Sequence, residues 1–222
     1  MVNILNNQYT IDDEWCFIKF KEYILPEHKV AVVAFSFRDS RIRSLSDWDN
    51  LYSKSLGTYY FGIVNSFKSF GIEENNIEFI NYFSDSKKAA KEKIHQADIL
   101  YFLGGLPDRM YDRLIEFDLI DEIKKHSGVV MGYSAGAMIQ LSEYHISPDN
   151  DYPLFTYNNG IGLIEDFGIE VHFENNEIQK TSIEKFRTEK KKPVYAIGDK
   201  GAVIVNGTDI QMIGDVIYFP IV

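Results

Sequence analysis

The chain has 222 residues, of which 45% are hydrophobic and 14% aromatic, enough for one sizeable core. Its formal net charge of -10 argues against nucleic-acid binding, because phosphate contacts require a basic surface. A single cysteine, Cys16, excludes an internal disulfide. Residues 1–7 lack the features of a signal peptide, and no stretch is long and apolar enough to span a bilayer. We therefore expect one cytoplasmic domain over residues 1–222, with no nucleic-acid or membrane partner, as a monomer or homodimer.

Apolar runs alternate with helical patterns through the first two thirds of the chain. The expected strands are 2–5, 29–37, 76–83, 98–103 and a run that begins at Val129. The expected helices are 12–24, 51–70, 84–96, 107–126 with a break at Asp118, and 135–142, while 38–50 is expected to be irregular. The alternation predicts an α/β fold in three layers, with a doubly wound, mostly parallel sheet covered by helices on both faces.

The character of the sequence changes after Leu141. Residues 144–159 are rich in Asp, Pro and Asn and are expected to form a loop, followed by a short extended piece at 160–164. The remaining expected elements are strands at 169–173, 193–197 and 216–222, a helix at 177–189, and a hairpin formed by 202–205 and 210–213. The Asn206-Gly207 dipeptide at the hairpin turn is a strong signal for that structure.

The sequence Gly132-Tyr133-Ser134-Ala135-Gly136 lies between an apolar strand and a helix-forming stretch. A serine between strand and helix occupies a sharp, strained turn that exposes its hydroxyl, and glycines on both sides allow the turn to close. This nucleophile elbow predicts covalent attack by Ser134 on a carbonyl group.

A nucleophilic serine requires a base, and histidine is the usual one near neutral pH. Most histidines of the chain occupy charged, helix-end or expected loop positions: His28, His95, His126 and His145. His172 instead lies near the end of the expected strand 169–173, and parallel α/β sheets carry their reactive groups at the carboxyl ends of strands. His172 is therefore the predicted base.

A carboxylate is expected to orient the imidazole of His172. Asp199 ends the next expected strand, and Asp151 lies in the loop between the serine and the histidine. Asp166 and Glu174 are weaker candidates, and the choice between Asp199 and Asp151 stays open.

Acyl transfer also requires hydrogen-bond donors for the oxyanion. The backbone N–H of Ala135, directly after the nucleophile, is one expected donor. Gly104-Gly105 ends the strand expected beside the elbow strand, and glycines there expose their N–H groups. Gly105 is therefore the second expected donor.

Taken together, these segments resemble the aspartyl dipeptidase (dipeptidase E) and cyanophycinase family of serine peptidases. The resemblance rests on motifs spread over most of the chain: Phe102-Leu103-Gly104-Gly105, Gly132-Tyr133-Ser134-Ala135-Gly136-Ala137, Asp151-Tyr152-Pro153, Gly160-Ile161-Gly162-Leu163, His172-Phe173 and Ile197-Gly198-Asp199. The family's fold is that of class I glutamine amidotransferases.

The resemblance implies a peptidase that cleaves small peptides next to an acidic residue, through an acyl-enzyme and without a metal or organic cofactor. It assigns these roles: Ser134 the nucleophile, His172 the base, Gly105 and Ala135 the oxyanion donors, and Asp199, where relatives tend to have Glu, or Asp151 the acid.

Two departures from the family pattern concern substrate binding. The Gly-Gly segment of relatives is usually followed by a polar pair, whereas this chain has Leu106-Pro107-Asp108, so that Asp108 is the expected substitute. Relatives that hold an aspartyl substrate carry an arginine soon after the His-Phe pair. Here Lys180 is the first cation in that stretch and the expected substrate clamp, although lysine binds a carboxylate less specifically than arginine.

Three alternatives remain open at this point. An α/β-hydrolase esterase shares the elbow, but its histidine lies near the chain end, whereas no histidine follows His172 here. A glutamine amidotransferase-like hydrolase would carry cysteine at the position of Ser134. The third alternative is a non-catalytic binding module on the same fold.

Overall fold

One eight-stranded sheet forms the centre of the molecule in the computed structural model, which describes residues 1–222. Its strand order is β10-β9-β1-β5-β4-β2-β3, with β8 paired to β9 off this path. The strands of this sheet are β1 (Val2–Asn6), β2 (Val30–Val33), β3 (Ile77–Ile80), β4 (Ile99–Phe102), β5 (Val129–Tyr133), β8 (Gly168–Glu170), β9 (Val194–Asn206) and β10 (Asp209–Phe219). The five strands β1 to β5 run parallel, and β9 is antiparallel to β1. A separate antiparallel pair consists of β6 (Glu143–Ile146) and β7 (Thr156–Asn159).

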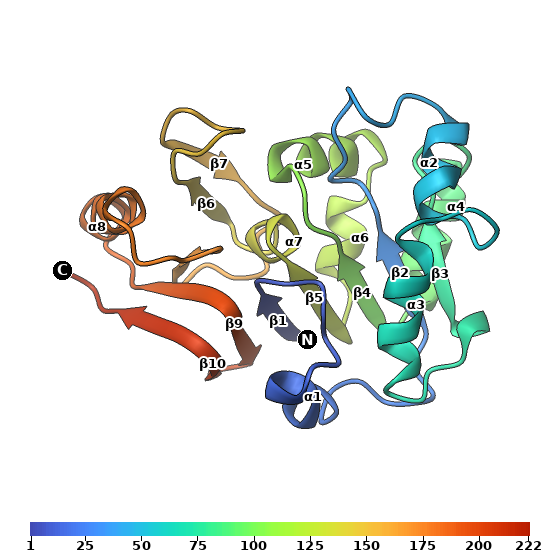
Figure 1. Ribbon diagram of the computed structural model, residues 1–222, viewed down its shortest axis with the longest axis horizontal. Coiled ribbons are helices and arrows are strands. Elements are labelled where there is room, and N and C mark those ends of the chain that lie inside the picture. The colour runs from blue at the N-terminus through green and yellow to red at the C-terminus, as the bar shows by residue number, and fades with distance from the viewer.

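Helices cover both faces of the sheet (Figure 1). The helices are α1 (Glu14–Phe20), α2 (Leu45–Tyr52), α3 (Tyr60–Lys68), α4 (Lys87–Gln96), α5 (Pro107–Glu116), α6 (Ile120–Lys124), α7 (Ala135–Met138) and α8 (Glu177–Lys190), with a 3-10 turn at Glu74–Asn76. Helices α1, α2 and α3 share one apolar cluster with the sheet, and α4 to α7 share another. Helix α8 packs in a third, smaller cluster against β9. None of these helices combines the length and the hydrophobicity needed to cross a membrane.

Alternation along the strands explains why the core has two large halves. In β2, Val30 and Val32 belong to the cluster of α1 to α3, whereas Ala31 and Val33 belong to the cluster of α4 to α7. Successive side chains of a strand point to opposite faces, so an uninterrupted apolar strand must be covered on both sides. The predicted three-layer, mostly parallel α/β architecture is confirmed.

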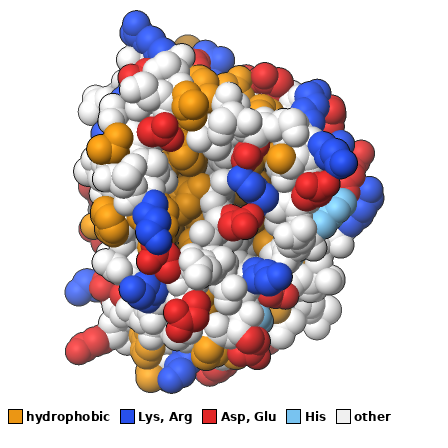
Figure 2. All heavy atoms as spheres, turned by 90° about the vertical axis from the view of Figure 1, so that its right-hand side faces the viewer, with side chains coloured by type: hydrophobic (Ala, Val, Ile, Leu, Met, Phe, Trp, Pro, Cys, Tyr) orange, Lys and Arg blue, Asp and Glu red, His pale blue; other side chains and the backbone are white.

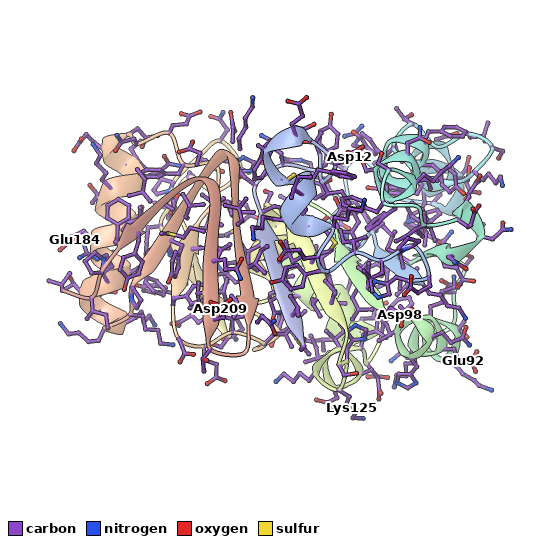
Figure 3. The ribbon with its side chains drawn as sticks, turned by 90° about the horizontal axis from the view of Figure 1, so that it is seen from below. Asp12, Glu92, Asp98, Lys125, Glu184 and Asp209 are labelled. Carbon is purple, nitrogen blue, oxygen red and sulfur yellow. The ribbon has the colours of Figure 1, made fainter.

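The outer surface carries both signs of charge. Over the face beside α2, α3 and β3, acidic and basic side chains alternate with exposed apolar ones (Figure 2). Viewed from below, Glu184 on α8 and Glu92 on α4 lie toward opposite ends of the long axis (Figure 3).

Helix α2 and the hairpin β6–β7 were missed by the sequence prediction. Ser44 caps α2 by accepting a hydrogen bond of 3.2 Å from the N–H of Asp47, so the expected irregular segment 38–50 contains a helix start. The expected loop 144–159 is also wrong at its ends, because residues 143–146 pair with 156–159. The loop expected from the Asp- and Pro-rich composition is present only between the two strands of that hairpin.

The carboxyl-terminal half of the sheet contains longer strands than predicted. The segments expected as separate strands at 193–197 and 202–205 join into β9, and those at 210–213 and 216–222 largely join into β10. The register of this pair shifts between Gly214 and Val216, opposite the turn-like residues 198–201. A β-bulge therefore lies between the segments that were expected as separate strands.

The packing of α5 against the core predicts that substitutions at two neighbouring positions of this helix differ strongly in their effect on stability. Leu114 is fully buried, whereas Ile115 is 51% exposed. We expect Leu114→Ala to lower the free energy of unfolding by about 2–5 kcal/mol because it removes buried methyl groups and leaves a cavity.

Ile115→Ala is the matched control, since it makes the same kind of change on the same helix without opening a cavity. Urea unfolding followed by circular dichroism measures both variants. Equal losses of stability in the two variants would contradict the assignment of Leu114 to the core.

Candidate active site

Ser134 lies at the turn between β5 and α7, and its backbone is strained. Its φ is +52° and its ψ is -117°, a conformation that L-residues rarely adopt. A Cβ atom on Gly132 would lie 2.4 Å from the carbonyl oxygen of Gly136, and one on Gly136 would lie 2.0 Å from the carbonyl oxygen of Phe102. The two glycines are therefore required for the close packing of α7 against β4 and β5, and the turn has the geometry predicted for a nucleophile elbow.

His172 follows β8 and faces the serine. Its Nε2 lies 2.8 Å from the Oγ of Ser134, within hydrogen-bond distance. The backbone of His172 is also in the left-handed region, with φ at +52°. Strand β8 ends at Glu170, three residues earlier than the sequence predicted, so the histidine lies on a loop rather than on the strand itself.

Two buried amides hold the loop that carries His172. The N–H of His172 donates to Oδ1 of Asn7 at 2.7 Å, and its carbonyl accepts from Nε2 of Gln179 at 2.8 Å. Gln179 also accepts a hydrogen bond of 2.9 Å from the N–H of Glu174. These contacts fix a strained backbone in one conformation and so fix the position of the imidazole.

Asp199 approaches the histidine through Asn7 instead of by direct contact. Its Oδ1 accepts from Nδ2 of Asn7 at 3.3 Å and from Nε2 of Gln8 at 3.1 Å. Asp151 forms an ion pair with Arg38 on the other side of the site. The expected direct hydrogen bond between a carboxylate and the imidazole of His172 is present for neither aspartate.

The turn after β4 presents a backbone donor toward the site. Gly105 has φ at +141°, and a Cβ atom there would lie 2.4 Å from the carbonyl oxygen of Ser36. The next N–H, of Leu106, donates to that same oxygen at 2.8 Å, whereas the N–H of Gly105 has no backbone acceptor. Ala135 begins α7, so its N–H has no partner within the helix. Both expected oxyanion donors are thus free of helical or turn bonds.

A cavity of about 490 Å³ contains Ser134, His172 and Gly105. Four carboxylates belong to its lining: Asp149, Asp151, Glu170 and Glu174. The lining contains no lysine or arginine. Asp108 lies outside the lining but accepts a hydrogen bond of 2.6 Å from the hydroxyl of Tyr152, which belongs to it.

Lys180 does not line this cavity, contrary to its expected role. It forms an ion pair of 3.2 Å with Glu177 and lies at a shallow depression on the outside of α8. Gln179, the residue before Lys180 on α8, is the one that points toward the His172 loop. One step along the helix directs Lys180 away from that loop.

A buried pair forms the floor of the cavity. Nε2 of His145 lies 2.7 Å from Oε2 of Glu170, and the Oγ of Ser147 donates to the same oxygen at 2.8 Å. His145, expected in a loop, lies on β6 and is 1% exposed. His145 therefore belongs to the floor of the cavity, and of the two histidines in the lining only His172 lies within hydrogen-bond distance of Ser134.

The surroundings of His172 lower its pKa below the ordinary value. Protein atoms displace water from the imidazole and disfavour its charged form, which is the largest cause. Negative charges oppose the shift, first Asp199 and then Asp149, Glu170 and Glu174. The ring is thus held mainly neutral near pH 7, the form in which Nε2 can accept a proton.

Asn7 and Gln179 were not singled out from the sequence. Asn7 directly follows the apolar strand β1, and a polar residue at the carboxyl end of a parallel strand is the signal that could have revealed it. Gln179 gave no such signal, since its role depends on how α8 packs beside the loop after β8.

Comparisons with known proteins concern the family and the fold of the chain. The sequence matches the model of Peptidase family S51 over residues 53–213. A search of curated proteins gave no match. Two solved structures share the fold, one described as a candidate peptidase E protein from Listeria monocytogenes EGD-e and one as a peptidase from an acI-B1 Actinobacterium.

The first has a TM-score of 0.66 and 18% identity, covering 95% of this chain and 96% of its own. The second has a TM-score of 0.65 and 20% identity, covering 100% of this chain and 91% of its own. The structures establish likeness of fold, and the family match extends over most of the chain, including the elbow and the His172 loop. The chain belongs to peptidase family S51 and is a serine peptidase.

Proposed function

We propose that Ser134 and His172 are the catalytic pair of this serine peptidase and that its substrates are small peptides cleaved through an acyl-enzyme. The observation that carries the proposal is the distance of 2.8 Å between Oγ of Ser134 and Nε2 of His172, with the serine on a strained elbow. A nucleophile and its base within hydrogen-bond reach are what covalent catalysis requires.

In the first step, Nε2 of His172 accepts the hydroxyl proton while Oγ of Ser134 attacks the scissile carbonyl carbon. The negative charge that develops on the carbonyl oxygen is stabilised by the N–H groups of Gly105 and Ala135. The imidazolium then donates its proton to the leaving nitrogen, the C–N bond breaks, and an ester to Ser134 remains. In the second step, water loses a proton to His172 while its oxygen attacks the ester carbon. The C–O bond to Ser134 then breaks, the imidazolium returns the proton to Oγ, and the acid is released.

Asp199 is the proposed acid of this site, acting without direct contact. Among the charged groups near His172 it has the largest effect in favour of the imidazolium. Asn7 connects it to the backbone of His172, so the carboxylate stabilises the charge while Asn7 fixes the ring position. Asp151 is less suited to the role because Arg38 neutralises it.

Replacement of the nucleophile tests the proposal directly. We expect Ser134→Ala to reduce kcat/KM by several orders of magnitude, because it removes the atom that forms the acyl bond. The assay uses a panel of dipeptides with Asp, Glu, Ala or Lys as the first residue. Hydrolysis is measured as the release of free amine.

Ser55→Ala, at an exposed position outside the lining of this cavity, is the control. Hydrolysis that persists in Ser134→Ala at the wild-type rate would refute the proposal. Labelling of the wild type by a fluorophosphonate, located on Ser134 by mass spectrometry, provides a second readout that does not depend on the choice of peptide.

The lowered pKa of His172 predicts the pH dependence. Its neutral form is the active base, so kcat/KM falls as pH decreases through a pKa below the ordinary value of about 6.5. Asp199→Asn removes the strongest charge that opposes this shift and therefore moves the acid limb of the profile to lower pH. It should also reduce kcat, by less than the roughly 10⁴-fold loss caused by removing a directly bonded triad aspartate.

Asp209→Asn is the matched control, an exposed aspartate on the neighbouring strand β10. Its profile should coincide with that of the wild type. An acid limb in Asp199→Asn that stays in place or moves to higher pH would show that Asp199 does not act on His172.

A further inference from the structure

A second cavity, of about 440 Å³, adjoins the candidate active site on the other side of the Gly104–Gly105 turn. Gly105 lines both cavities, and Tyr133, next to the nucleophile, lines the second one. A peptide whose scissile carbonyl lies at Gly105 can therefore extend into both. The walls of the second cavity are mostly aromatic and aliphatic, and they include Tyr9, Phe37, Ile42, Leu51, Tyr52, Tyr59 and Ile63.

The two cavities have opposite charge. The first is lined by four carboxylates and no lysine or arginine, whereas the second is lined by Arg38 and Arg41 and no carboxylate. Arg38 is neutralised by Asp151 at the boundary between the cavities. Arg41 has no acidic partner. Its guanidinium remains available to a ligand.

Tyr59 orients the guanidinium of Arg41. Nη2 donates to the hydroxyl of Tyr59 at 2.9 Å, and the guanidinium carbon lies 5.6 Å from the centre of the tyrosine ring. Both groups belong to the lining of the second cavity. An arginine held against an aromatic ring with its charge unpaired is suited to bind a carboxylate through two parallel hydrogen bonds.

A glycine keeps part of the second cavity open. Gly62 lies inside α3, where glycine is less favourable than alanine by roughly 0.5–1 kcal/mol. A Cβ atom built on it meets no atom within 4 Å, so no neighbour within the fold requires a glycine. Gly62 instead lines the cavity, and its missing side chain leaves room there.

From this juxtaposition we propose that the second cavity binds the carboxyl-terminal residue of a short peptide. An apolar or aromatic side chain of that residue fills the space beside Tyr52, Tyr59 and Gly62, and Arg41 binds its free carboxylate. The amino end of the peptide lies in the acidic cavity with Ser134. This assignment rests on the proposed function, since it places the scissile bond at Gly105 between the two cavities.

Charge complementarity determines the direction of the peptide. A dipeptide with free ends carries an ammonium group on one side of the scissile bond and a carboxylate on the other. The acidic cavity attracts the ammonium and repels the carboxylate, and the reverse holds for the cavity of Arg41. The residue that leaves as the free amine is therefore the one in the second cavity.

Binding to the Ser134→Ala protein tests the inference separately from catalysis. The probes are Ala-Phe and Asp-Phe, each as the free acid and as the carboxyl-terminal amide, measured by titration calorimetry. We expect each free acid to bind about tenfold or more tightly than its amide, because only the acid forms charge-assisted bonds with Arg41. Arg41→Gln in the same background should remove this difference by weakening the acids alone.

Arg43→Gln is the matched control, since Arg43 lies on the same loop, is exposed and lines neither cavity. Equal affinity for acids and amides, an unchanged ratio in Arg41→Gln, or no binding of any probe would overturn the inference.

Filling the second cavity provides an independent test. We expect Gly62→Phe to weaken binding of Ala-Phe at least tenfold more than binding of Ala-Ala, because the new ring occupies the space of the peptide side chain. Asn65→Phe is the control, because it adds the same ring at an exposed position of α3 that lines neither cavity, and it should bind both peptides as the parent does. Equal effects of Gly62→Phe on both peptides would place the side chain elsewhere.

Hydrolysis by the otherwise wild-type protein separates the two proposals. Cleavage of amides and acids with equal kcat/KM would leave the catalytic pair standing and overturn the role of Arg41. Binding that follows the expected pattern, together with no cleavage of any peptide, would overturn the proposed function and support the second cavity as a binding site.

Discussion

The close packing of the elbow against the central strands is the constraint on which the site depends. Ser134 adopts a positive φ because β5 is fixed between β1 and β4 and α7 must start immediately after it. The gap between Gly136 and the carbonyl of Phe102 has no room for a side chain. The packing energy of the sheet and its two apolar halves therefore stabilises a backbone conformation that is unfavourable by itself.

The same principle applies to His172, the proposed base. His172 also has a positive φ, and it lies beyond the end of β8, where regular hydrogen bonding no longer holds the chain. Asn7 from the end of β1 and Gln179 from α8 replace that bonding. Ser134 and His172 are thus both bonded to the end of β1, because the N–H of Ser134 donates to the carbonyl of Asn6 and the N–H of His172 donates to Oδ1 of Asn7. Oγ of Ser134 and Nε2 of His172 lie 2.8 Å apart there.

Charge around the site is divided rather than uniform. Carboxylates gather in the cavity of Ser134, where Asp149, Glu170 and Glu174 favour the charged form of His172. Cations lie on the other side of the Gly104–Gly105 turn, and the ion pair between Arg38 and Asp151 joins the two regions. The chain's overall acidity conceals this asymmetry, because net charge does not report where charges meet.

The sequence by itself determined the α/β architecture and singled out Ser134 and His172, which the fold brings together. Strand periodicity, the Gly-x-Ser-x-Gly turn between strand and helix, and a histidine near the end of a later expected strand are local signals. The first two are present in the fold, and the histidine lies beside the serine although its strand ends at Glu170. Local signals failed where distant pairing partners determine whether a segment forms a strand. Residues 143–146 and 156–159 form strands by pairing with each other, and four segments expected as separate strands join into the two strands β9 and β10. Tertiary structure alone decided that Asp199 reaches His172 through Asn7, that Asp151 pairs with Arg38, and that Lys180 points away from the cavity. The physical reason is that side-chain direction depends on which elements pack together, and a one-residue step along a strand or a helix turns a side chain from the site toward solvent.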